Sequence, residues 1–198
     1  MVINESNMEF RFYEGVNAIK FDDTEFYRKA FNRLPGGKGV DIIAYSDDEI
    51  QLIEVKNCTG NEIENRWRIC VNNSNLDSAP RDLDVENRNS VDIEVVKKVA
   101  STISCIYGAW TESQMSEKAK ELVDFGKNMN QKSMLGDKKS LVVLLVLEGD
   151  FGSYSVSRSK KMIMNGIKNS IDSKLKWLKC RVEVVDSDTN RNHLFSIS

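Results

Sequence analysis

The segment "GVDIIAYSDDEIQLIEVKN", residues 39–57, decides the fold prediction because it contains two apolar runs joined by a polar turn. Val40–Tyr45 and Ile50–Lys56 have the length and composition of β-strands, and the intervening "SDDE" is typical of a tight turn. We therefore predict an antiparallel hairpin. Its second strand ends in the charged residues Glu54 and Lys56.

The register of this hairpin follows from its turn. If the turn centres on Asp47 and Asp48, the numbers of paired residues sum to 95. Asp41 then lies opposite Glu54, with the two Cβ atoms about 5 Å apart on one face of the sheet. Lys56 shares that face because side chains alternate along a strand. The sequence thus predicts two carboxylates and an ammonium in one patch.

Two ionised carboxylates close together destabilise a fold unless a cation compensates them. Mg²⁺ or Mn²⁺ would do so, with Asp41 and Glu54 as ligands and the Val55 backbone carbonyl as a further oxygen. Lys56 could then orient or deprotonate an attacking water and stabilise charge on a phosphate. The alternative is a plain salt bridge, in which Lys56 neutralises Glu54 at an exposed strand end.

The remaining pattern predicts an α/β fold with a central mixed sheet flanked by helices. We expect one domain over residues 1–198, with its core at about 22–185 and a long surface excursion at 58–90 in which Trp67 is an anchor. The further expected elements are helices at about 22–34, 92–106, 113–129 and 159–178, a strand within 140–150 that is buried on both faces, and a last strand at 180–186.

Two N-terminal features allow more than one interpretation. Residues 1–21 fit either a hairpin around Glu14 and Gly15 or an amphipathic helix. Asp22 and Glu25 have the spacing of a capping box for the helix that follows.

The hairpin residues also carry a resemblance. "VD", twelve residues, then "EVK" resembles the motif of the PD-(D/E)xK phosphodiesterase superfamily, the restriction-endonuclease-like fold, although Val40 replaces the proline. The wider segment "AIKFDDTEFYRKAFNRLPGGKGVDIIAYSDDEIQLIEVKN" is similar to uncharacterised bacterial members. The resemblance implies that Asp41, Glu54 and Lys56 are catalytic.

Members of that superfamily often add an acid from the first helix, and helical phase favours Asp23 here. They also carry a glutamine or lysine on the following helix. Lys97 and Lys98 are the available residues, but both are expected to turn away from the apolar face, so neither is included.

Charge is unevenly distributed along the chain. Residues 1–90 hold 11 Lys and Arg against 17 Asp and Glu, whereas Arg158–Arg181 holds eight basic residues and one acid. An acidic half could hold cations and a basic half phosphates. The expected backbone contacts to nucleic acid are Lys38, Arg158, Lys160, Lys161 and Lys168. A solvated basic helix face is an equal alternative.

Composition excludes several other classes of protein. Four widely spaced cysteines and one histidine argue against a zinc site and against a Ser-His-Asp hydrolase. The N-terminus lacks the pattern of a signal peptide, and no 18-residue apolar stretch occurs, so we expect a cytoplasmic protein with no membrane partner.

These observations predict a metal-dependent nuclease that acts on nucleic acid, with DNA favoured over RNA. A homodimer would provide two sites for cutting two strands. Two alternatives stay open. One is a catalytically inactive nucleic-acid-binding or protein-interaction module with the same fold, and the other is a purely structural α/β domain.

Overall fold

The computed structural model describes residues 1–71, 89–112, 117–134, 139–151 and 159–198. Its strands are β1 (Val2–Glu5), β2 (Met8–Phe12), β3 (Asn17–Lys20), β4 (Ile42–Tyr45), β5 (Glu49–Asn57), β6 (Ser140–Glu148), β7 (Arg181–Val185) and β8 (Phe195–Ile197). Its helices are α1 (Glu25–Lys29), α2 (Glu62–Asn65), α3 (Val91–Glu112), α4 (Lys120–Met134) and α5 (Lys160–Lys174), with short 3₁₀ turns at Phe31–Arg33, Arg66–Ile69, Glu117–Ala119 and Lys176–Leu178.

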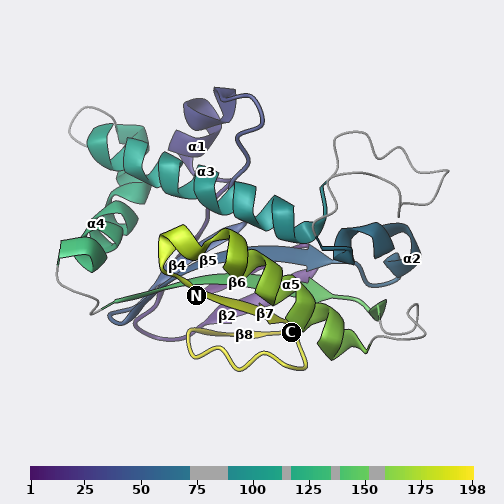
Figure 1. Cartoon of the computed structure of the whole chain (residues 1–198). Helices are drawn as coiled ribbons and strands as arrows, with labels where there is room; N and C mark the ends of the chain where they lie inside the picture. Colours follow the sequence, from purple (N-terminus) through teal and green to yellow (C-terminus); the bar gives the residue numbers. More distant parts are fainter. Residues whose placement is uncertain (72–88, 113–116, 135–138, 152–158) are drawn as a thin grey trace.

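The main sheet has the order β3-β4-β5-β6-β7. The pairs β3–β4 and β4–β5 are antiparallel, whereas β5–β6 and β6–β7 are parallel. This confirms the predicted α/β class and mixed sheet. Helices cover one face of the sheet and leave β1, β2 and β8 on the other (Figure 1).

The two faces of the central strands bury different side chains. On β5, Ile50 and Leu52 pack against α1, α3, α4 and α5, whereas Ile53 and Val55 pack against the three-stranded sheet. The continuous apolar run of β6 is needed because both of its faces are covered. Helices flank the main sheet as predicted, and the three-stranded sheet, which was not predicted, covers its other face.

That second sheet settles the ambiguity of residues 1–21. Strands β1 and β2 form a hairpin around Ser6 and Asn7, which both have positive φ angles of 51° and 61°. Two such residues form the tight turn that matches the twist of paired strands. The turn therefore lies eight residues before the Glu14–Gly15 position, and the helical alternative is wrong. Strand β8, which pairs with β2, was not predicted.

The first helix is shorter than predicted. It begins after Thr24, whose side chain donates to the Phe21 carbonyl at 2.8 Å, and it ends at Lys29. The capping box of Asp22 and Glu25 is therefore wrong, because the residue at the N-cap is Thr24, two positions after Asp22. Among the described helices, none is both long and apolar enough to cross a membrane.

The predicted excursion at 58–90 contains α2 and the turn at Arg66–Ile69, and residues 72–88 lie outside the described residues. Trp67 is 4% exposed and anchors this segment, as expected. The predicted helix at 113–129 corresponds to the described segment from Glu117 to Met134.

Candidate functional site

The β4–β5 hairpin has the predicted register. Its pairs run from Ile42 opposite Ile53 to the turn, and each pair of residue numbers sums to 95. Regular pairing stops one residue short of the predicted Asp41–Glu54 pair, because Asp41 donates its N–H to the Ile53 carbonyl at 3.1 Å. Asp41 therefore lies at the end of the ladder, beside Glu54.

Asp41 is held in place by the hairpin and by α3. Its Oδ2 accepts from the backbone N–H of Val55 at 2.7 Å, so the carboxylate takes a donor of β5. The preceding residue, Val40, donates its N–H to Thr102 Oγ1 on α3 at 2.9 Å. Gly39 allows this close approach, because a Cβ there would lie 2.1 Å from a ring carbon of Phe21. The loop thus fixes the position of Asp41.

Glu54 is the buried centre of the site. Its side chain is 1% exposed, and its Oε1 lies 2.6 Å from Lys98 Nζ and 2.8 Å from Lys56 Nζ. Lys98 Nζ also lies 3.2 Å from Oδ1 of Asp41, so one ammonium bridges the two carboxylates. The other oxygen of Glu54, Oε2, is buried and has no hydrogen-bond partner among the described residues.

A second layer of charges connects this centre to the surface. Lys56 Nζ lies 2.9 Å from Oε1 of Glu94 on α3, and Oε2 of Glu94 lies 3.2 Å from Arg68. The guanidinium of Arg68 stacks 4.6 Å from the centre of the Trp67 ring. The network therefore runs from a buried carboxylate to a half-buried arginine.

Burial raises the pKa of Glu54 to about 7, which the nearby ammonium groups only partly offset. Burial lowers the pKa of Lys56, but the carboxylates of Glu54 and Glu94 outweigh it and raise this pKa above its usual value. Lys98 behaves in the same way, with Glu54 and Asp41 outweighing burial to raise its pKa. Both lysines are therefore charged at neutral pH.

Sequence reasoning missed Lys98. The helical phase chosen for α3 placed Lys98 outside, but the buried residues are Val91, Val95, Lys98, Thr102, Cys105 and Ala109, among others. These recur at intervals of three and four residues. Lys98 and Thr102 are the polar members of that series, and a polar residue on an otherwise apolar helical face was the available signal. Lys97, by contrast, is exposed as predicted.

Neither acid before α1 joins the contacts of the site. Asp23 is exposed and precedes the helix. It therefore lies on no face of α1, and the helical phase that favoured it as the additional acid is wrong. Burial raises the pKa of Asp22, and the Asp41 carboxylate contributes to this rise. Throughout the described residues, no group of three or more His, Cys, Asp or Glu side chains is arranged to hold a metal ion. Asp41 and Glu54 are thus the candidate metal ligands from side chains.

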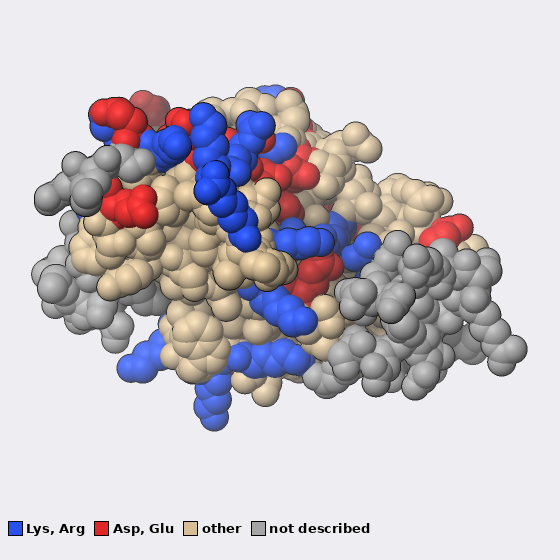
Figure 2. All heavy atoms as spheres, turned by 90° about the horizontal axis from the view of Figure 1, so that it is seen from above, with Lys and Arg blue, Asp and Glu red and all other residues tan. Residues whose placement is uncertain are grey.

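The other predicted site groups have varied surroundings. Val55 lies opposite Val146 within the parallel β5–β6 ladder, between Glu54 and Lys56. Of the expected nucleic-acid contacts, Lys38, Lys161 and Lys168 are exposed, Lys160 forms an ion pair with Asp186, and Arg158 lies outside the described residues. On the helix-covered side of the molecule, Lys and Arg side chains gather with Asp and Glu among them (Figure 2).

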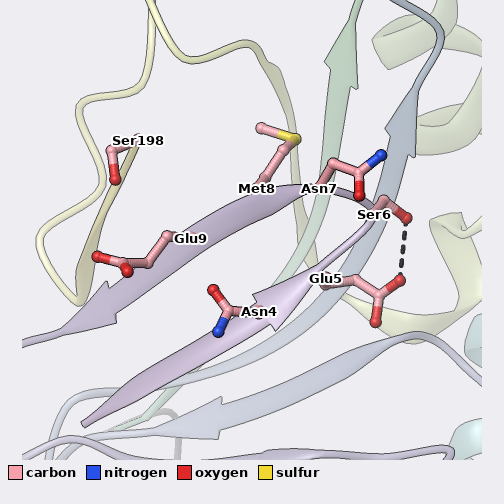
Figure 3. A pocket seen from close by; sticks show the side chains of 7 residues that line it. All are labelled: Asn4, Glu5, Ser6, Asn7, Met8, Glu9 and Ser198. Carbon is pink, nitrogen blue, oxygen red and sulfur yellow. Dashed lines mark hydrogen bonds between the residues drawn. The ribbon is translucent and has the colours of Figure 1, made fainter.

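A hollow elsewhere on the surface shares no residue with this site. It lies along the β1–β2 hairpin and the C-terminal residue, and it is lined by Asn4, Glu5, Ser6, Asn7, Met8, Glu9 and Ser198 (Figure 3). The hydroxyl of Ser6 donates to Glu5 there at 2.9 Å.

The fold and the buried charges define an α/β protein with a carboxylate–lysine cluster at the end of its hairpin. Residues 24–198 match the model of a family of unknown function, DUF6661, and the chain belongs to that family. The matched region begins after β1, β2 and β3, and includes all residues of the cluster. Comparison with curated proteins and with solved structures gave no match.

Proposed function

We propose that this protein is a metal-dependent nuclease of the PD-(D/E)xK type, with a restriction-endonuclease-like fold, that hydrolyses phosphodiester bonds of nucleic acid, with DNA favoured over RNA. One observation carries the proposal. Glu54 Oε2 is buried without a partner in the described part of the chain, beside a second carboxylate on Asp41. The predicted motif residues Asp41, Glu54 and Lys56 also lie in one cluster.

The two carboxylates suit Mg²⁺ or Mn²⁺. A buried carboxylate oxygen without a donor costs free energy, which a bound cation would recover. Hard divalent cations take carboxylate oxygens and keep other positions for water and phosphate, so a pair of acids is a sufficient protein contribution. When bound, such an ion would polarise a phosphoryl oxygen and lower the pKa of a water.

The side chains of the cluster have separate roles in this proposal. Asp41 and Glu54 hold the cation. Lys56 is charged, so we assign it the role of donor that orients the attacking water and stabilises phosphate charge, rather than that of base. Arg68, stacked on Trp67, would bind a phosphate next to the reacting one. Lys38, Lys161 and Lys168 would contact the backbone further away.

A non-catalytic binding module of the same fold is the second candidate, and the charge balance of the cluster favours it. Three acids, Asp41, Glu54 and Glu94, face three bases, Lys56, Lys98 and Arg68. In such a cluster the ion pairs compensate the buried charges without any metal.

The test is a cleavage assay with purified protein and circular, linear and single-stranded DNA, with RNA alongside, in Mg²⁺ or Mn²⁺. Glu54→Gln and Lys56→Ala should abolish cutting, whereas Glu64→Gln, an exposed control on α2, should not. EDTA should stop the reaction. The molecular mass of the active protein in solution would show whether it is a homodimer, which could cut two strands. Absence of cutting in every lane, with no Mn²⁺-induced rise in Tm, would favour the binding module instead.

A further inference from the structure

Lys98 has the position of a cation within the candidate site. Its Nζ lies between the two carboxylates, 2.6 Å from Glu54 Oε1 and 3.2 Å from Asp41 Oδ1. The side chain is 11% exposed, which is far below the exposure of an ordinary surface lysine. A metal ion held by Asp41 and Glu54 could use the unpartnered Oε2 of Glu54, but on Asp41 it would meet Lys98 at Oδ1, because Oδ2 already accepts from the Val55 N–H.

The surroundings of Lys98 show that this placement is part of the packing. Val95, Val99 and Thr102, its neighbours along the inner face of α3, are all buried. Thr102 accepts from the backbone of Val40, which fixes the helix against the residue that precedes Asp41. Helix α3 therefore places the Lys98 ammonium beside the two carboxylates, and the same helix is hydrogen-bonded to the loop that precedes Asp41.

We propose that Lys98 is a built-in counter-ion that competes with the divalent cation for Asp41 and Glu54, and so sets the metal affinity of the site. This inference rests on the proposed function, because it assumes that these carboxylates hold a metal. Like charges this close repel strongly in a buried environment, so an ammonium and a divalent cation on the same two carboxylates would displace each other.

Lys98 thereby differs from Lys56 in its expected role. Lys56 has a second acceptor, Glu94, to which its ammonium can stay bound when Glu54 is taken by a cation. The described acceptors of Lys98 are the two candidate ligands themselves. Among the described residues, Lys98 therefore has no acceptor that lies outside the candidate metal site.

The test measures Mn²⁺ affinity by calorimetry, without nucleic acid. Lys98→Met removes the charge and keeps the length of the side chain, Lys98→Gln keeps a hydrogen-bond donor, and Lys97→Met is the exposed control on the same helix. Both Lys98 variants should bind Mn²⁺ at least about tenfold more tightly than the wild type, and Lys97→Met should not differ. A Lys98 variant that folds only with Mn²⁺ would support the same conclusion. In the wild type, Mn²⁺ should also increase labelling of Lys98 by an amine reagent.

Equal or weaker Mn²⁺ binding by both Lys98 variants would overturn the inference, provided that the wild type binds Mn²⁺ and Glu54→Gln does not. That outcome leaves the proposed nuclease intact. Absence of Mn²⁺ binding in the wild type and in both Lys98 variants would reject the metal site, and with it both proposals. Tighter binding by the Lys98 variants without cleavage of any substrate would support the inference and reject the nuclease.

Discussion

Lys98 Nζ on α3 lies 2.6 Å from Glu54 Oε1 on β5, although 44 positions separate the two residues in the chain. The contact fixes the position of α3 over the end of the hairpin, because the buried carboxylate of Glu54 needs a hydrogen-bond donor. It also affects how the stability of the metal-free protein depends on pH and on substitutions, and how tightly the site would bind a cation.

The stability of the metal-free protein should fall as the pH rises from about 4.5 to about 7. Glu54 has a folded-state pKa of about 7 against an ordinary value of 4.5, so in this window the folded protein keeps a proton that the unfolded chain has lost. Raising the pH therefore favours unfolding, by about 3 kcal/mol in total for a shift of this size. Denaturant unfolding at several pH values measures it.

Glu54→Gln is the control for this pH dependence, because it removes the titrating group and keeps the shape of the side chain. The difference in unfolding free energy between the wild type and this variant should change across the window. Parallel curves for the two proteins would show that Glu54 does not titrate there.

Gly39→Ala should destabilise the fold and displace Asp41. The added Cβ would lie 2.1 and 2.4 Å from ring carbons of Phe21, which is fully buried. Overpacking of this kind costs about 1–3 kcal/mol. Gly166→Ala on α5 is the matched control, since its Cβ meets nothing within 4 Å and alanine favours helix. Equal Tm values for the two variants would contradict the prediction.

Asp92→Asn should weaken the attachment of α3 to α5. The Asp92 side chain is fully buried and accepts from Lys174 at 2.8 Å and from Ser170 at 2.7 Å. Loss of its charge leaves a half-buried ammonium with a weaker partner, which we expect to lower the unfolding free energy by about 2–3 kcal/mol. Asp124→Asn, in an exposed pair with Lys127, should change it little. A similar effect of the two substitutions would argue against a structural role for Asp92.

Joint substitution of Lys161 and Lys168 by Gln should weaken DNA binding without changing any sequence preference. These exposed residues are seven positions apart on α5 and so share a helical face. Each phosphate contact contributes about 0.9 to the slope of log affinity against log salt, so the slope should decrease by up to about 2. The same change at Lys118 and Lys127 is the control. An unaltered slope would mean that the α5 face is merely solvated.

The sequence predicted the hairpin well because local rules determine it. Turn residues at Asp47 and Asp48 set the register, and alternation along β5 placed Glu54 and Lys56 on one face. Lys98 escaped prediction because several phases of α3 look equally apolar, and only packing against the hairpin selects among them. The position of a helix on a sheet is a tertiary property that periodicity alone does not contain.

Two other differences have the same origin. The capping box at Asp22 and Glu25 satisfied a local pattern, but α1 begins only at Glu25, and the Thr24 hydroxyl before it donates to the Phe21 carbonyl instead of capping the helix. Strand β8 has three residues and pairs with β2 at the opposite end of the chain. Short strands formed by such distant pairing leave little trace in the sequence around them.

The parallel pairing of β5 with β6 has a consequence for how the chain acquires its structure. On one side β5 pairs with its hairpin neighbour β4, but on the other its partner is far along the chain, with Glu49 and Ser140 91 residues apart. During synthesis the hairpin can close early, yet one edge of β5 stays unpaired until β6 emerges. An apolar strand edge left open for that long is prone to aggregation, and slow closure of distant contacts limits the folding rate. The charged residues at the end of β5 would thus also protect that edge in the nascent chain.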